Sequence, residues 1–389
     1  MKKIPTTRLG DEYGGASCLI TAIILILIVS AGFFTLQSFL STRDDSPEPA
    51  AEKIAFDLQE LRPGWWETSN RIYFDIPARV VFRLPEGKGG IDPEALSRKI
   101  WAEFERIGDI FNPFDPASET ARLNREDSRG TISVSKEMHA VFMLSKKLWD
   151  ASDGAFDPTM LPVKRLWEQA VQSQQIPSNR DIMRTLSRVG FEHVERIKDR
   201  HEIRRKTGHL QFDFGGIAKG YAVDHVAALL REHDISAALV ALSGEIRTFG
   251  KNNDRPWRIG IQHPLKMNDL WGIVSSETDI RVSTSGNYRQ PLIIAGHEFY
   301  HIFDPRTARP VTEKILGVTT LCSSQKASNA LLDGAATAIV VMGVESGLKL
   351  ANRLGIDALV LKRSRDGRIE EIMTDGFKRH YEPSPQQME

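Results

Sequence analysis

Two adjacent glycines and a lysine lie within 215–219, where an apolar and aromatic run leads into an amphipathic segment. The pattern is typical of a strand that passes through a turn into a helix, and glycines let other groups approach the backbone of such a turn. The helix leaves N–H groups unpaired at its start, and Lys219 adds a positive charge beside them. A phosphate is the expected ligand, although a tight turn with a solvated lysine has the same residues.

A carboxylate and a hydroxyl stand four residues apart, at Asp333 and Thr337, in a stretch rich in Ala, Leu, Ile and Val. Residues at this spacing share one face of a helix. Mg²⁺ prefers oxygen ligands and often takes few of them from protein, so these side chains and a carbonyl near Gly216 form a candidate half-site. The alternatives are an acid paired with a lysine or the backbone, and a hydroxyl bonded to the carbonyl one turn earlier.

An imidazole, that of His301, stands three residues before the carboxylate of Asp304. Taken by itself, this histidine is more typical of a half-buried structural residue. The chain has neither the G-x-x-x-x-G-K-[ST] pattern of a P-loop nor the G-x-G-x-x-G fingerprint of a dinucleotide-binding domain. The spacing of these residues alone therefore indicates a site for a phosphate and a divalent metal, but it does not identify a reaction.

The elements that must position these residues are visible as apolar periodicity. Short strands outnumber helices in the second half of the chain, which predicts a mixed α+β domain instead of a regular doubly wound sheet. Helices are expected at 93–110, 138–152, 172–188 and 324–342, strands at 71–84, 237–242, 257–263 and 272–275, a hairpin within 194–210, and a hydroxyl-rich loop at 282–288.

The composition of the chain excludes several classes of protein. Its 389 residues are 41% apolar and 26% charged, which is globular composition. The chain has 51 basic residues (Lys and Arg) and 51 acidic residues (Asp and Glu). No net positive charge therefore favours binding to a nucleic acid, and any anion must be recognised by a local group of residues. The two cysteines, Cys18 and Cys322, form no C-x-x-C motif, and an internal disulfide is not expected because Cys18 lies in an apolar segment.

Residues 17–40 form an apolar segment without charge, long enough for a helix that crosses a bilayer. A cleaved signal peptide is the alternative, but no A-x-A-like site follows the apolar run. Lys2, Lys3 and Arg8 precede the segment, which predicts a cytoplasmic N-terminal segment at 1–16. The expected protein is a single-pass protein of the inner, or cytoplasmic, membrane.

The body that follows this anchor is expected outside the cytoplasm, in the periplasm or an equivalent extracytoplasmic space. A charged and proline-containing stretch at 41–64 is typical of a linker. One folded domain is expected at 65–380, with a short tail at 381–389.

Several motifs occur in one order along this domain, and together they resemble the ApbE family, the FAD:protein FMN transferases once assigned to thiamine biosynthesis. The likeness covers nearly all of the chain after the apolar segment, which makes it far more specific than any single motif. The motifs are Phe114 with Ser-Glu at 118–119 and Leu-Asn at 123–124, Gly-Ala-Phe-Asp-Pro-Thr at 154–159, Asp-Phe-Gly-Gly-Ile-Ala-Lys-Gly-Tyr-Ala-Val-Asp at 213–224, Thr-Ser-Gly-Asn-Tyr at 284–288, His-Ile-Phe-Asp-Pro-Arg-Thr at 301–307 and Asp-Gly-Ala-Ala-Thr at 333–337.

The resemblance implies a single α+β catalytic domain that uses Mg²⁺ to move the FMN part of FAD onto a threonine or serine hydroxyl of a target protein, releasing AMP. It assigns the metal to the Asp333 carboxylate, the Thr337 hydroxyl and the Gly216 carbonyl, and it makes His301 the base for the acceptor hydroxyl. It places FAD against Phe114, Ala155, Phe156, Asp157, Asp213, Lys219, Ser243, Gly244, Glu245, Ser285, Gly286, His301 and Ile302.

Three departures from the family pattern affect the expected flavin site. Ser243 stands where the first of two glycines is usual, and Glu245 stands where aspartate is common. Ala308 replaces a glycine that usually follows Asp-Pro-x-Thr. Phe114 lies in a stretch that lacks the usual tyrosine hydroxyl. None of these changes removes a proposed metal ligand or His301.

The resulting hypothesis is a membrane-anchored flavin transferase whose partner is a membrane or extracytoplasmic redox protein. Two alternatives remain at this stage. An FAD pyrophosphatase would use water in place of the protein hydroxyl and release FMN and AMP. A non-catalytic flavin-binding carrier or assembly protein would keep the pocket without turnover.

Overall fold

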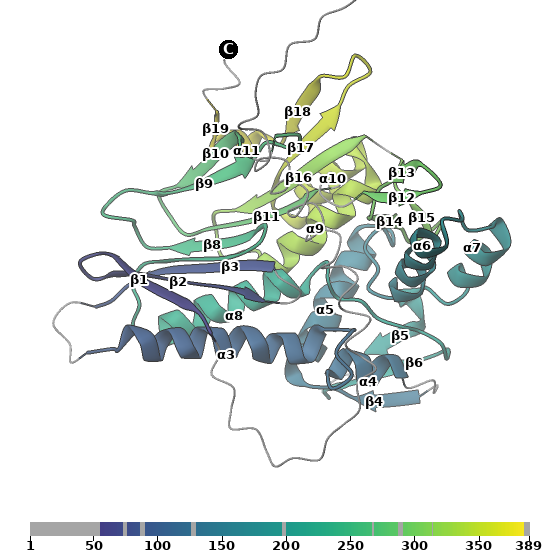
Figure 1. The fold of residues 1–389 in the computed structure, drawn as a ribbon, viewed down its shortest axis with the longest axis horizontal. Coiled ribbons are helices and arrows are strands. Elements are labelled where there is room, and N and C mark those ends of the chain that lie inside the picture. The colour runs from purple at the N-terminus through teal and green to yellow at the C-terminus, as the bar shows by residue number, and fades with distance from the viewer. Residues whose placement is uncertain are drawn as a thin grey trace, which may run out of the picture. The chain divides into compact units, whose positions relative to one another are not determined.

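The computed structural model describes residues 55–72, 76–85, 90–125, 130–196, 200–266, 268–286, 291–312 and 314–384, all of which belong to one compact unit (Figure 1). The expected membrane anchor at 17–40 lies outside these residues. Within the described ranges, no helix is long and apolar enough to cross a membrane.

The framework of the domain is a nine-stranded sheet in which every neighbouring pair is antiparallel. Helices cover one face and a smaller sheet covers the other, which is why β16 is buried at every position. The strands, in sheet order, are β1 (Asp57–Arg62), β2 (Trp65–Ile72), β3 (Ile76–Arg83), β7 (Ala238–Leu242), β8 (Glu245–Phe249), β11 (Ile280–Gly286), β16 (Ile315–Cys322), β17 (Asp357–Arg363) and β18 (Ile369–Met373).

The helical face carries the largest core, and Figure 1 shows α3 and α8 running beneath the sheet while α9 lies against its centre. The helices of this layer are α3 (Pro93–Phe111), α5 (Lys136–Ala151), α8 (Ala218–Glu232), α9 (Asn329–Met342) and α10 (Val344–Leu354). The second core lies on the other face, under β9 (Trp257–Gln262), β10 (Leu270–Ser276), β19 (Tyr381–Pro383) and α11 (Asp375–Lys378).

Smaller elements close the end of the domain where several expected motifs lie. They are α4 (Glu119–Arg125), α6 (Leu161–Ser173), α7 (Asn179–Leu186), the 3-10 turn η2 (Phe191–His193), the sheet of β4 (Gly130–Ser133), β6 (Glu202–Arg205) and β5 (Val194–Arg196), and the short pairs β12 (Leu292–Ile294) with β13 (His297–Phe299) and β14 (Phe303–Asp304) with β15 (Arg309–Pro310).

The expected mixed α+β class is confirmed, but several element assignments are wrong. Residues 172–188 are not one helix, because Gln174 adopts a left-handed conformation that ends α6 and α7 begins after Ser178. The loop expected at 282–288 is largely strand β11, whose hydroxyls pair across the sheet; the Oγ1 atoms of Thr284 and Thr319 are 3.0 Å apart. The expected strand at 71–84 includes the end of β2 and all of β3.

Both expected ends of the domain are also displaced. Strand β1 pairs with β2, so the sheet begins before residue 65, inside the expected linker. Strand β19 pairs with β10, so the first residues of the expected tail belong to the fold. In both cases a charged, polar strand at a sheet edge lacks the apolar pattern that marks a buried one.

Helices α8 and α9 cap each other. On α9, the Asp333 Oδ2 atom accepts a hydrogen bond from the Gly220 amide near the start of α8, at 3.1 Å. On α8, the Asp224 Oδ2 atom accepts one from the Ala330 amide at the start of α9, at 3.2 Å. Each carboxylate satisfies an amide that its partner helix cannot bond internally. This reciprocal arrangement fixes the two helix starts against each other.

The close approach of the two helices depends on Gly220. A Cβ atom at this position would lie 2.4 Å from the backbone oxygen of Asn329, and the contact is with backbone that cannot rotate away. We therefore expect Gly220→Ala to lower the free energy of unfolding by about 3 kcal/mol through overpacking.

Urea unfolding followed by circular dichroism measures this effect, with Gly334→Ala as the matched control. At Gly334 the added Cβ meets the Cδ1 atom of Leu148 at 2.4 Å, which is the end of a flexible side chain. That variant should lose only about 1 kcal/mol. Equal losses in the two variants would contradict the backbone contact as the cause.

Candidate active site

A cavity of about 840 Å³ opens where the α8 and α9 starts meet the turn between β7 and β8. Every residue that the family resemblance assigned to the flavin or metal site lines it: Phe114, Ala155, Phe156, Asp157, Asp213, Gly216, Lys219, Ser243, Gly244, Glu245, Ser285, Gly286, His301, Ile302, Asp333 and Thr337. Asn287 and Tyr288 of the motif at 284–288 lie outside the described residues.

The backbone that leads to Asp213 is held by Asn124, whose side chain bonds both the amide and the carbonyl of Phe212, at 2.7 and 2.9 Å. The Asp213 carboxylate then accepts from the Gly215 amide at 2.8 Å and from the Lys164 Nζ atom at 3.1 Å. Burial raises the pKa of Asp213, but the Lys164 charge and the Gly215 amide lower it by more, so the net shift is downward. Asp213 therefore stays ionised and orders the diglycine turn.

Lys219 lies between two buried carboxylates. Its Nζ atom is 3.4 Å from both carboxylate oxygens of Asp333 and 3.6 Å from Oε1 of Glu245, and it donates to the Gly215 carbonyl at 2.9 Å. Burial lowers the pKa of Lys219, yet the two acids outweigh it and hold the pKa above its ordinary value. The lysine and the Gly220 amide, expected to attract a phosphate, thus hold a carboxylate of the protein.

The second acid, Glu245, is buried against the same lysine. Glu245 is 1% exposed, and its Oε2 atom has no hydrogen-bond partner among the described residues. Burial raises the pKa of Glu245, Lys219 lowers it only in part and Asp333 raises it again, so the pKa is raised to about 8. Glu245 is therefore largely protonated at neutral pH unless a further cation is present, and a cation bound beside Asp333 would favour its ionised form.

The three residues expected to supply donors to Mg²⁺ are neighbours in the structure. The Thr337 hydroxyl is 3.4 Å from the Asp333 carbonyl and 3.3 Å from Ser285 Oγ, and a Cβ at Gly216 would lie 3.4 Å from Thr337 Oγ1. Within the described ranges no cluster of three or more His, Cys, Asp or Glu could hold a metal. A mixed set of carboxylate, hydroxyl and carbonyl oxygens fits Mg²⁺, which takes its remaining ligands from water and phosphate.

Asp157 lines the cavity but uses its carboxylate elsewhere. Its Oδ1 atom accepts from the amide and the hydroxyl of Thr159, at 2.7 and 2.6 Å, and its Oδ2 atom accepts from the Phe191 amide at 2.9 Å. Burial raises the pKa of Asp157 despite these bonds. The carboxylate shapes the turn at 155–159, so the turn can present its backbone and Phe156 to a ligand.

The turns in which serine and alanine replace the usual glycines keep the backbone conformation that glycine favours. Ser243 has a φ of 56° and Ala308 a φ of 52°, both in the left-handed region. The Asp304 carbonyl accepts from the Ala308 amide at 2.8 Å, so that turn is formed. The substitutions therefore add local strain and leave both turns in place.

Ser243 is exposed, which makes it the cleaner place to measure this strain. We expect Ser243→Gly to keep or slightly raise the free energy of unfolding, by up to about 1 kcal/mol, because relief of left-handed strain exceeds the entropy that glycine adds to the unfolded chain. Thermal unfolding measures the change. The control, Ser276→Gly, alters a strand residue outside the left-handed region and should be destabilising. If Ser243→Gly lowered the free energy of unfolding by more than the control does, the backbone at Ser243 would not be strained.

Sequence reasoning missed Lys164 and Glu168, which lie one turn apart on α6 and line the cavity. The Lys164 Nζ atom is 5.0 Å from the ring centroid of Phe114, in addition to its bond with Asp213. Burial raises the pKa of Glu168, and Lys164 lowers it in part. The signal was a pair of opposite charges four residues apart on one helix face, the same spacing that marked Asp333 and Thr337.

The described residues form one α+β domain with a ligand cavity of about 840 Å³ that is lined in part by charged side chains. The sequence profile of the ApbE family matches residues 74–360, and the chain belongs to that family. A FAD:protein FMN transferase of Vibrio cholerae serotype O1 is 30% identical over 293 residues, 75% of this chain and 86% of that protein. The FAD:protein FMN transferase of Escherichia coli (strain K12) is 28% identical over 300 residues, 74% of this chain and 83% of that protein.

Solved structures show the same relationship. The flavin transferase ApbE from Vibrio cholerae matches with a TM-score of 0.71 at 28% identity, covering 81% of this chain and 99% of that chain. The apo form of the flavinyl transferase ApbE from Pseudomonas stutzeri matches with a TM-score of 0.69 at 26% identity, covering 84% and 97%.

Proposed function

We propose that this ApbE-family protein is a Mg²⁺-dependent FAD:protein FMN transferase that attaches FMN to a threonine or serine hydroxyl of an acceptor protein. The observation that carries the proposal is the buried group of Lys219 between Asp333 and Glu245, beside the Thr337 hydroxyl. A divalent cation would compensate both buried carboxylates in their ionised form, and the cavity of about 840 Å³ lies in the usual size range of small-molecule and cofactor sites. The names of the relatives support the same activity.

In the proposed reaction, the acceptor hydroxyl oxygen attacks the phosphorus on the FMN side of the FAD pyrophosphate. A phosphoester bond forms, the phosphorus–oxygen bond to AMP breaks, and AMP leaves with the electron pair. His301, which is partly buried in the cavity wall, takes the hydroxyl proton. Mg²⁺ bound by Asp333, Thr337 and the Gly216 carbonyl would neutralise charge on the pyrophosphate.

The remaining cavity residues would bind and orient FAD. Lys219 holds the Asp333 carboxylate in place through their ion pair. The exposed ring of Phe114 offers a flat apolar surface, and Lys164 holds a positive charge above it. Ala155, Phe156, Ser243, Gly244, Ser285, Gly286 and Ile302 complete the wall.

The test incubates the full-length chain with FAD, Mg²⁺ and a candidate acceptor redox protein, followed by a denaturing gel viewed under ultraviolet light. A fluorescent acceptor band is the expected result. Free FMN without a labelled band would replace transfer by pyrophosphate hydrolysis. Unchanged FAD would leave only a flavin-binding carrier and overturn the proposed activity.

We expect His301→Ala to slow transfer about a hundredfold or more while changing FAD affinity little, because a general base acts on the acceptor proton. Flavin fluorescence measures binding, and the rate of acceptor labelling measures transfer. His297→Ala is the control, since His297 is exposed on β13 and does not line the cavity. Equal losses of binding and rate in His301→Ala would make His301 a binding residue only.

We also propose that residues 17–40 anchor the protein in the cytoplasmic membrane with the catalytic domain outside the cytoplasm. The support is the length and apolar character of that segment and the lysines and arginine before it. The acceptor would then be a membrane or extracytoplasmic redox protein. Protease treatment of intact spheroplasts tests the orientation, and a domain that stays protected while a periplasmic marker is cleaved would contradict it.

A further inference from the structure

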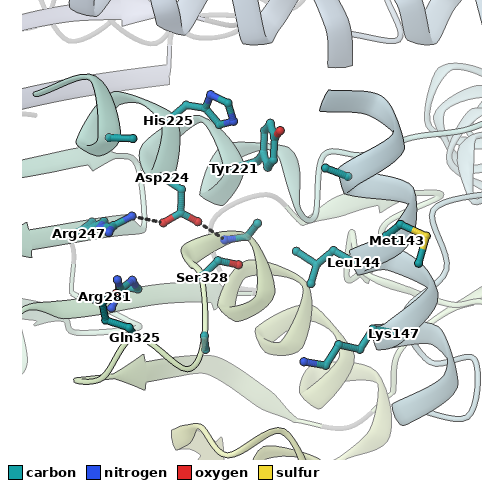
Figure 2. A pocket seen from close by; sticks show the side chains of 14 residues that line it. Met143, Leu144, Lys147, Tyr221, Asp224, His225, Arg247, Arg281, Gln325 and Ser328 are labelled. Atoms are coloured by element: carbon teal, nitrogen blue, oxygen red, sulfur yellow. Dashed lines mark hydrogen bonds and ion pairs between the residues drawn. The ribbon is translucent and has the colours of Figure 1, made fainter. Parts of the chain in front are cut away.

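A second cavity, of about 630 Å³, lies at the start of α9, between α5 and α8 (Figure 2). It shares no lining residue with the candidate active site. Figure 2 shows Asp224 between Arg247 and the first turn of α9, with Arg281 below them and Lys147 extending from α5. The two cavities thus lie at the two caps of the α8 and α9 pair.

The charged residues at the second cap are mostly cationic. Among the described residues that line the cavity, Arg247, Arg281 and Lys147 are cationic, and Asp224 is the one acid. His225 also lines it, with its Nδ1 atom 3.0 Å from Glu103 on α3. Three cations and one carboxylate among these lining residues leave an excess of two positive charges.

The two arginines are buried and only partly satisfied. Arg281 is 4% exposed, and its Nη1 atom donates to the Ser324 carbonyl at 2.7 Å. Arg247 donates from Nη1 to Asp224 Oδ1 at 2.7 Å. The Nε atoms of both arginines are buried and have no hydrogen-bond partner among the described residues. Buried donors of this kind are costly to leave unpaired.

The neighbouring guanidinium groups also repel each other. Burial lowers the pKa of Arg247, Asp224 raises it, and the charge of Arg281 lowers it again. Asp224 interacts with both arginines: burial raises its pKa, and the charges of Arg247 and Arg281 lower it in part. An anion between the arginines would supply the missing acceptors and remove the repulsion.

The rest of the wall is apolar. Met143 and Leu144 of α5 line the side away from the arginines (Figure 2), and Ala327 and Ala330 lie near the start of α9. The cavity therefore has the two arginines on one side and an apolar stretch of α5 on the other. A ligand that fits both has a charged head group on an apolar or aromatic body.

We propose that this cavity binds a phosphate monoester with an apolar or aromatic body, its dianionic phosphate lying against Arg281 and Arg247 and its body extending toward the α5 side, where Lys147 lies. A dianion matches the excess of two positive charges, and a phosphate offers enough oxygen acceptors for two guanidinium groups. The site does not depend on FMN transfer, since none of its residues belongs to the candidate active site. It would place a second small-molecule site on the two helices that carry Lys219 and Asp333.

Phenyl phosphate is the probe, titrated calorimetrically into the full-length chain with and without saturating FAD. We expect saturable one-to-one binding that FAD does not abolish, with inorganic phosphate and benzoate binding more weakly because each lacks one half of the probe. Binding that disappears when FAD is present, or no saturable binding at millimolar concentrations, would overturn the proposal.

Variants locate the site. Arg281→Gln should weaken phenyl phosphate binding about tenfold. Arg281 is buried, so its replacement can disturb folding, and the exposed Lys147 provides a second variant; Lys147→Gln should weaken binding roughly threefold. The matched control is Lys146→Gln, which alters the neighbouring lysine on α5 that bonds Asp150 and does not line the cavity. Equal affinity in Lys147→Gln and Lys146→Gln would overturn the assignment.

Discussion

Asp333→Asn is expected to lower the rate of FMN transfer at least about a hundredfold at saturating FAD, while the fold is retained. The carboxylate accepts from the Gly220 amide, faces the Lys219 ammonium and belongs to the proposed Mg²⁺ ligands. Asparagine has nearly the same shape and keeps one oxygen acceptor for the amide. The substitution therefore removes the charge with little change in packing.

A Mg²⁺ titration of transfer activity separates the metal role from a structural one. If Asp333 is a ligand, raising the Mg²⁺ concentration should recover part of the lost rate, because weaker binding is overcome by mass action. Asp366→Asn is the control, since Asp366 lies on the surface between β17 and β18 and pairs only with local groups. Wild-type activity in Asp333→Asn would discard the metal assignment.

Lys219→Met is expected to lower the free energy of unfolding by roughly 2 kcal/mol in the presence of a chelator, because it leaves Asp333 and Glu245 buried without their counter-ion. The lysine side chain is 26% exposed and both acids are 2% exposed, so the remaining charges are poorly solvated. Mg²⁺ should restore part of this loss, because a bound cation replaces the missing charge.

Urea unfolding with chelator and with Mg²⁺ measures both effects. The double variant Lys219→Met/Glu245→Gln should be more stable than Lys219→Met alone, because it removes one of the two uncompensated acids. This recovery of stability by a second substitution tests whether Lys219, Asp333 and Glu245 interact as one group. A Lys219→Met protein that is as stable as the wild type and indifferent to Mg²⁺ would contradict it.

Local sequence patterns were sufficient for the elements with strong apolar periodicity. The helix expected at 93–110 matches α3, and Ile100, Phe104 and Ile107 are all buried on one face as their spacing predicted. The helix expected at 138–152 matches α5 within two residues at its start. The family motifs also predicted which residues line one cavity. Motifs that occur in one fixed order along a chain belong to one fold, and that fold brings them together.

Local patterns failed where pairing with a distant strand decides the structure. Hydroxyls and a glycine made 282–288 resemble a loop, yet β11 lies at the centre of the sheet between β8 and β16. The polar strands β1 and β19 were assigned to a linker and a tail because nothing in their own composition requires a partner. Strand preference depends on the neighbours that a strand meets, and the sequence of one segment does not contain them.

The chain by itself determined the residue types of the site, the faces of the helices that carry them, and the family they resemble. Only the tertiary structure decided what those residues contact. Lys219 and Asp333 are 114 residues apart, and packing of α8 on α9 places them 3.4 Å from each other with Glu245 beside them. The same packing turned an expected phosphate-binding lysine into the counter-ion of two acids. A side chain's electrostatic role depends on burial and on charges from distant segments, which local spacing cannot specify.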